Sequence, residues 1–148
     1  MVDDHVKDYG LNLDPDFQRG HVWTMEQRVA YLEYFLQGGE GGRVLCFNHS
    51  DWNASPRVGD KYEILDGKQR LTSVLMFLRN EVGVFGGHLY RDFEGRPDIS
   101  CGFRWRIFAL PTRADVLRYY LSMNAGGTPH SAEEIERVRG LLAKEVGK

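Results

Sequence analysis

The chain has 148 residues, of which 42% are hydrophobic and 27% are charged, and its formal net charge is −2. This length suits one domain with its own core, and no run approaches the roughly 20 apolar residues that a membrane span needs. A slightly negative chain has no general attraction to nucleic acid, so DNA contact would require a local basic face. We therefore expect a single domain over residues 1–148 with no membrane segment.

Cysteine and histidine usage narrows the class further. Cys46 and Cys101 stand far apart in the sequence, and in a reducing compartment such cysteines are usually buried thiols, not a disulfide. The five histidines lack the close spacing of zinc ligands. The charged N-terminus lacks the apolar stretch of a secretory signal. We expect a cytoplasmic protein without a disulfide framework or a dedicated transition-metal site.

The first half of the chain predicts two strands and two helices. Residues 13–23 carry a proline, a glycine and alternating apolar positions, which indicates an extended segment. Thr24 and Gln27 fit a capping box, so a helix should begin there and end at Gly38-Gly39. Its apolar stripe consists of Met25, Val29, Leu32, Phe35 and Leu36.

After that helix, residues 43–47 and 61–65 are predicted strands separated by a polar loop over 48–60. An apolar repeat then predicts a second helix over 68–80. Its members are Leu71, Val74, Leu75 and Leu78.

The second half begins with an irregular stretch over 83–102. Residues 103–110 alternate apolar residues with arginines, as a strand with one solvated face does. A helix should open at Pro111-Thr112 and end before 124–129, and a capping box at Ser131 and Glu134 should start the last helix.

The most informative segment is Asp66-Gly67-Lys68-Gln69-Arg70, because it joins a predicted strand directly to a predicted helix. The first N–H groups of a helix lack partners and carry partial positive charge, which favours an anion such as phosphate. Gly67 would allow close approach, while Lys68 and Arg70 add positive charge. The alternative is that Asp66 only caps the helix and the basic side chains are solvated.

Two further polar clusters have both a structural and a functional interpretation. Arg19, after Gln18, could reach a phosphate while Trp23 stacks, although a tryptophan is more often a core residue. Residues 124–128 could close over a ligand through Asn124 and backbone amides, or could simply end a helix in a flexible turn.

Taken in order, residues 15–23, 64–71 and 123–128 resemble the three signatures of the DGQQR domain family. That family forms the N-terminal domain of GmrSD-type modification-dependent restriction systems and belongs to the ParB/sulfiredoxin superfamily. The resemblance covers about residues 13–142. The chain departs from the family at Lys68, where glutamine is usual, and no HNH-type nuclease segment follows the third signature.

The resemblance implies an α+β, ParB/sulfiredoxin-like fold in which a small mixed sheet is flanked by helices. It also implies a site for a nucleoside triphosphate with Mg²⁺. The catalytic positions would be Asp66, Gln69 and Arg70, with Asp66 also the metal ligand. The nucleotide-binding positions would be Gln18, Arg19, Gly67, Lys68, Arg70, Asn124, Gly126 and Gly127.

Three functions follow as hypotheses. The leading one is a slow nucleoside triphosphatase in phage or bacterial DNA modification or restriction, working with a nuclease or modification enzyme as partner. The alternatives are a non-catalytic nucleotide- or DNA-binding module that gates a partner, and a ParB-like nuclease or phosphotransferase. DNA would meet a basic face, for which the alternative is an ordinary solvated surface. That face would consist of Arg104, Arg106, Arg113 and Arg118.

Overall fold

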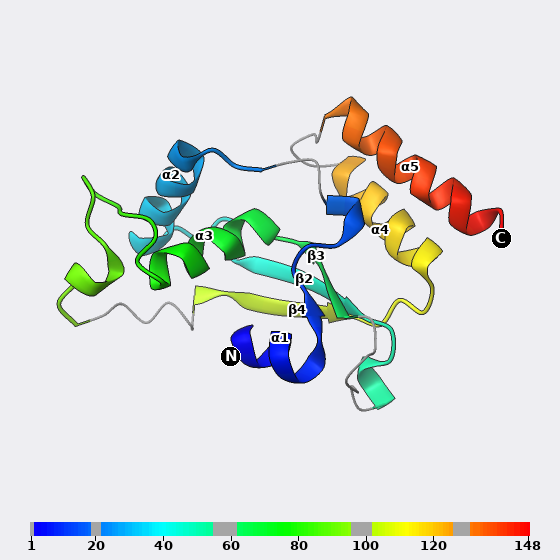
Figure 1. Ribbon diagram of the computed structural model, residues 1–148, viewed down its shortest axis with the longest axis horizontal. Helices are drawn as coiled ribbons and strands as arrows, with labels where there is room; N and C mark the ends of the chain where they lie inside the picture. The colour runs from blue at the N-terminus through cyan, green and yellow to red at the C-terminus, as the bar shows by residue number, and fades with distance from the viewer. Residues whose placement is uncertain (1, 19–21, 55–61, 96–101, 126–130) are drawn as a thin grey trace. The chain divides into compact units, whose positions relative to one another are not determined.

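The computed structural model describes residues 2–18, 22–54, 62–95, 102–125 and 131–148 (Figure 1). The chain forms two compact units, each assembled from separate segments. The first unit comprises Met1–His21, Cys46–Leu65 and Ile107–Lys148, and the second comprises Val22–Leu45 and Asp66–Arg106. Among the described helices, none combines the length and the apolar character needed to cross a membrane.

The strands β1, β2, β3 and β4 form a four-stranded sheet in the order β1-β3-β2-β4. Their bounds are Leu11–Asn12, Val44–His49, Tyr62–Asp66 and Arg104–Phe108, respectively. β1 and β3 run parallel, with Leu11 opposite Tyr62. In contrast, Arg70, four residues after the end of β3, donates to the carbonyl of Val44 at the start of β2, so β3 and β2 run in opposite directions. The predicted α+β fold with a small mixed sheet is confirmed.

The second unit is built on two helices, α2 (Met25–Leu36) and α3 (Lys68–Leu78), which pack together. The predicted capping box is confirmed: the Thr24 hydroxyl accepts the Gln27 N–H at 3.2 Å, and the Gln27 side chain accepts the Thr24 N–H at 2.9 Å. Their shared core consists of Leu32, Phe35, Val74, Phe77, Val82 and Val84.

The apolar period predicts Met25 on the inward stripe of α2, and this prediction is wrong. Its side chain is 49% exposed, because it is the first residue of the helix and lies one turn before Val29, which packs against the core. A residue at the end of a helix can follow the apolar period without having anything to pack on. The apolar period therefore predicted core residues correctly in the interior of the helix but not at its first position.

The first unit contains α1 (Val2–Tyr9), α4 (Arg113–Ala125) and α5 (Ala132–Val146), with short 3₁₀ turns η1 (Asp16–Gln18) and η2 (Trp52–Ala54). α4 packs against α5 (Figure 1). The Ser131 side chain accepts the Glu134 N–H, so the predicted start of the last helix is confirmed. The sequence of α1 contains no apolar stripe that would predict this helix, and none of its residues is buried.

β2 extends further than predicted, because Asn48 and His49 belong to the strand and are buried. The Asn48 amide donates to the Leu110 carbonyl at 3.3 Å and accepts the Leu110 N–H at 2.8 Å. A buried polar side chain is tolerated when its hydrogen bonds are made in this way. The predicted loop therefore begins two residues later. Cys46 is buried as predicted, and Cys101 lies outside the described residues.

Candidate functional site

The turn at residues 66–70 joins β3 to α3 through a single glycine. Gly67 is the N-cap of α3, with φ of +97°, and a Cβ atom at this position would clash with the Leu45 side chain. A left-handed conformation without room for a side chain favours glycine. No side chain caps the helix, so the alternative in which Asp66 serves as N-cap is wrong. The first N–H groups of α3 keep their partial positive charge.

The Asp66 side chain pairs with Arg70 instead. Asp66 Oδ2 lies 2.8 Å from Arg70 Nη2, one helical turn away. Arg70 Nη1 donates to the carbonyls of Gly42 at 2.5 Å and Val44 at 2.9 Å. The Arg70 side chain is only 16% exposed, whereas that of Asp66 is 51% exposed. Arg70 thus connects α3 to the start of β2, while Asp66 remains accessible.

Gln69 faces α2. Its side-chain oxygen accepts the Trp23 N–H at 3.2 Å and Arg28 Nη2 at 2.8 Å. Arg28 Nη1 donates to the Gln69 carbonyl at 3.3 Å and to the Ser73 hydroxyl at 3.1 Å. The Ser73 hydroxyl in turn donates to the Gln69 carbonyl at 2.7 Å. This network fixes the first turn of α3 against α2.

Arg28 and Ser73 were missed in the sequence. The signal for Arg28 was available, because it lies at i, i+4 and i+7 with Leu32 and Phe35 and so stands in the inward stripe of α2. It is only 7% exposed. A charged residue in register with core positions indicates a specific partner, and that partner is the first turn of α3.

Two aromatic residues lie beside this network. The Trp23 ring contacts the Tyr31 ring edge-on, with centroids 5.5 Å apart. The Tyr31 hydroxyl donates to the Gly42 carbonyl at 3.2 Å. Burial raises the pKa of Tyr31 to about 12, against the opposing charges of Arg70 and Arg43, so the hydroxyl keeps its proton and remains a donor. Trp23 packs within the second unit.

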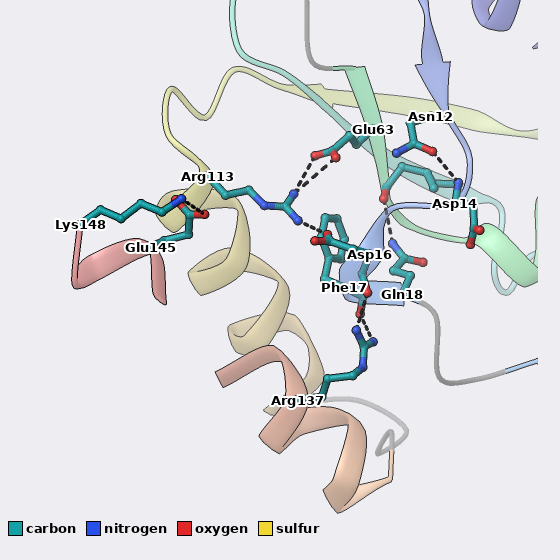
Figure 2. A network of polar contacts seen from close by, with 11 residues as sticks. Asn12, Asp14, Asp16, Phe17, Gln18, Glu63, Arg113, Arg137, Glu145 and Lys148 are labelled. Carbon is teal, nitrogen blue, oxygen red and sulfur yellow. Dashed lines mark hydrogen bonds and ion pairs between the residues drawn. The ribbon is translucent and has the colours of Figure 1, made fainter. Parts of the chain in front are cut away.

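The described part of the first signature is held in place by hydrogen bonds within the first unit. The Gln18 amide nitrogen donates to the carbonyls of Ile64 at 2.8 Å and Leu65 at 2.7 Å, near the end of β3. Arg137 of α5 donates to the carbonyls of Asp16 and Phe17, the latter at 3.1 Å (Figure 2). η1 is thereby connected both to β3 and to α5. Arg19 lies outside the described residues.

Arg113 of α4 is the centre of an ion network in the same unit (Figure 2). It pairs with Asp16 on η1 and with Glu63 on β3, the second at 3.2 Å. Its guanidinium also lies over the Phe17 ring, 5.1 Å from the centroid. Because its charge is balanced by two carboxylates, Arg113 adds little to a basic surface.

The third signature is described only at its start. Asn124 lies in the last turn of α4, and its amide donates to the Tyr120 carbonyl at 2.8 Å. Gly126 and Gly127 lie outside the described residues. Asn124 and Gln18 belong to the first unit, whereas residues 66–70 belong to the second. Residues 66–70 form one continuous turn from the end of β3 into α3, within the second unit.

The remaining predicted residues differ in exposure. Lys68 is the partly buried first residue of α3. Arg104 and Arg106 are exposed on β4, while Arg118 pairs with Asp115 at 3.3 Å. Across the described residues, no three His, Cys, Asp or Glu side chains gather closely enough to hold a metal ion. Any cation at the turn would therefore depend on Asp66 and on oxygens that a ligand brings.

Comparison with known proteins identifies the family. A family model for the GmrSD restriction endonuclease, N-terminal domain, matches residues 2–109. The matched segment contains the first two signatures and ends before α4, so the third signature lies beyond it. No curated protein and no solved structure matches the chain. The match covers most of the chain, which therefore belongs to the family of GmrSD restriction endonuclease N-terminal domains.

Proposed function

We propose that this chain binds a nucleoside triphosphate at the Asp66–Arg70 turn and hydrolyses it slowly as part of a DNA restriction system. The observation that carries the proposal is the first turn of α3, which has a glycine N-cap, no capping side chain and Lys68 as its first residue. Such a turn favours a phosphate group, because its N–H groups and the helix dipole attract an anion. The family match supplies the link to restriction.

Arg70 can join this site by exchanging one partner. Its pair with Asp66 involves a half-exposed carboxylate, and surface pairs of this kind contribute roughly 0–1 kcal/mol. A charge-assisted hydrogen bond to phosphate contributes about 1.5–3 kcal/mol. The exchange therefore favours the nucleotide. Arg70 Nη1 can keep its two carbonyl partners while Nη2 turns to the phosphate.

The same exchange would release Asp66 for a second role. A magnesium ion bound with a nucleotide takes one or two protein carboxylates together with phosphate oxygens, and Asp66 suits this because it is accessible. The ion would supply neutralisation of phosphate charge. The Gln69 side chain is oriented by its bonds to Trp23 and Arg28, so we assign it the positioning of the attacking water.

The nucleotide contacts of Gln18, Arg19, Asn124, Gly126 and Gly127 rest on the motif resemblance and remain part of this proposal. So does the assignment of the mixed sheet to the ParB/sulfiredoxin-like class. Superposition of an experimental structure on that class would test the fold. Alanine substitution at Arg19 or Asn124, followed by nucleotide titration, would test the contacts.

Calorimetric titration with each nucleoside triphosphate, with and without Mg²⁺, tests binding, and release of free phosphate tests hydrolysis. Asp66→Asn should reduce phosphate release while the protein stays folded. Glu136→Gln removes an exposed carboxylate on α5 and serves as the matched control. The proposal is wrong if the wild-type protein binds no nucleoside triphosphate. Equal phosphate release by wild type and Asp66→Asn would exclude a catalytic charge at Asp66.

A specific observation also favours the binding-only alternative. Gln69 Oε1 and Asp66 Oδ2, the two oxygens best placed to act on water, both accept hydrogen bonds from arginines. In that case nucleotide binding would gate a nuclease or modification enzyme without bond cleavage. Saturable nucleotide binding with no phosphate release would select this function over hydrolysis.

We also propose that DNA contacts the chain through Arg104 and Arg106. They are exposed and two residues apart on β4, so their side chains share one face of the strand. Each phosphate neutralised on duplex DNA contributes about 0.9 to the slope of log affinity against log salt. Replacing both by alanine should flatten that slope, whereas Arg139→Ala on α5 should not. Absence of DNA binding at low salt would overturn this contact.

A further inference from the structure

Arg28 is a buried cation whose partners among the described residues are neutral. It donates to the Gln69 side-chain oxygen, the Gln69 carbonyl and the Ser73 hydroxyl. Among the described residues, no ion pair joins its guanidinium to a carboxylate. Both terminal nitrogens of the guanidinium thus donate hydrogen bonds, while no described carboxylate pairs with its charge.

This arrangement is unusual for a residue that is only 7% exposed. Buried charges are normally paired, because removal from water is costly unless an opposite charge compensates. Burial lowers the pKa of Arg28, but a guanidinium stays protonated at any ordinary pH. The charge therefore persists, and in a poorly solvated setting its field is screened less than that of a surface lysine.

The charge of Arg28 lies next to the first turn of α3. Two of its three acceptors belong to Gln69, the second residue of α3, next to the uncapped N–H groups. Within residues 66–70, Lys68 and Arg70 are cationic and Asp66 is the single carboxylate, already paired with Arg70. The turn itself therefore has no further carboxylate that could balance the charge of Arg28.

We propose that Arg28 is a positioning residue that makes the α3 turn selective for the most highly charged phosphate ligand, a triphosphate over a monophosphate. It acts through Gln69 by fixing the first turn of the helix, and its uncompensated charge is balanced by the ligand. This inference rests on the proposed function, and it assigns to Arg28 a role in selectivity that the turn residues alone do not supply.

The test compares tripolyphosphate, pyrophosphate and orthophosphate as calorimetric probes of the full chain. Arg28→Gln keeps hydrogen-bond donors and removes the charge, and it should weaken tripolyphosphate binding by roughly tenfold but orthophosphate binding by only about twofold, because Coulomb energy scales with ligand charge. Arg91→Gln, an exposed residue of η3 (Tyr90–Asp92) in the same unit, is the matched control and should change neither. A purely structural role would weaken all three probes equally, and that result would overturn the inference.

Arg28→Lys provides an independent measurement if Arg28→Gln does not fold. Lysine keeps the charge and loses the fork, so the ratio of tripolyphosphate to orthophosphate affinity should stay within about twofold of wild type. Collapse of that ratio in Arg28→Lys would overturn the inference.

The experiments distinguish a failure of the proposed function from a failure of the role proposed for Arg28. Tripolyphosphate binding without nucleotide binding would exclude the proposed function and leave the role of Arg28 to be decided by the ratio. Nucleotide binding with unchanged selectivity in Arg28→Gln would exclude only the role of Arg28. A wild-type protein that binds neither class would exclude both.

Discussion

Arg113 in the first unit and Arg28 in the second are both largely removed from water, yet their surroundings differ. Arg113 is paired with two carboxylates, Asp16 and Glu63, from two other elements. Among the described residues, the partners of Arg28 are the neutral oxygens of Gln69 and Ser73. Both guanidinium groups donate hydrogen bonds, but of the two only Arg113 pairs with described carboxylates. A balanced arginine is best explained as part of the fold, whereas an unbalanced one leaves charge available to a ligand.

The strongest test of this comparison is Arg113→Ala. Removing one partner of a buried ion pair leaves the other charge uncompensated, and Glu63 is itself largely buried. We expect a loss of about 3 kcal/mol in the free energy of unfolding, measured by urea denaturation. Arg118→Ala removes an exposed arginine from the same helix and should cost less than about 1 kcal/mol. Similar losses for the two variants would contradict a structural role for the Arg113 network.

The second prediction concerns Gly67, on which the shape of the Asp66–Arg70 turn depends. Gly67→Ala places a side chain at φ of +97° and against Leu45, so we expect about 2 kcal/mol of destabilisation together with weaker phosphate binding. Gly140 on α5 has open space where a Cβ atom would lie, and Gly140→Ala should stabilise the chain by about 0.5–1 kcal/mol. Thermal melts of the two variants should therefore shift in opposite directions.

Arg28→Met should change stability much less than Arg113→Ala does. The oxygens that Arg28 contacts keep other donors, since Ser73 donates to the Gln69 carbonyl and the Trp23 N–H donates to its side chain. Removing an unbalanced buried charge also removes its desolvation cost. We expect a change within about 1 kcal/mol by urea denaturation. A loss as large as that of Arg113→Ala would make Arg28 a residue of the fold alone.

The smallest effect is expected from His5, whose contribution to the stability of the first unit depends on pH. His5 Nδ1 lies 3.1 Å from the Tyr62 hydroxyl, and burial lowers the pKa of His5 below its usual 6.5. The unfolded chain then takes up the proton first, so stability is full above about pH 6.5 and declines as pH falls toward the folded pKa. Burial also raises the pKa of Tyr62 to about 12, so Tyr62 stays a donor. In His5→Gln, this part of the pH dependence should disappear from the unfolding curve.

Features whose partners lie nearby in the chain could be predicted from the sequence. Thr24 and Gln27 cap each other across three residues. The apolar period predicted a helix over residues 68–80, and the observed α3 spans Lys68–Leu78. The role of Asp66 could not be predicted, because a carboxylate at this position can either cap the helix or pair with Arg70 one turn later. Local spacing contained both outcomes and did not rank them.

Features that depend on distant partners could not be predicted at all. Asn48 is buried because the backbone of Leu110 satisfies its amide, and Gln69 is oriented by Arg28, 41 residues away in sequence. Helical or strand periodicity shows which positions face the core, but it does not identify the partner of a polar residue at such a position. The candidate site residues were predicted from the strand-turn-helix pattern and the motif resemblance, but the contacts of the described ones required the structure.

The ion network around η1 joins the segment that the family model matches to the helices that follow it. Asp16 and Glu63 lie within the segment that the family model matches, whereas their partner Arg113, and Arg137 on α5, lie beyond residue 109. A substitution at Arg113 or Arg137 would therefore weaken contacts to η1, which lies 97 or more residues earlier in the chain. The position of the first signature thus depends on two helices that lie outside the matched segment.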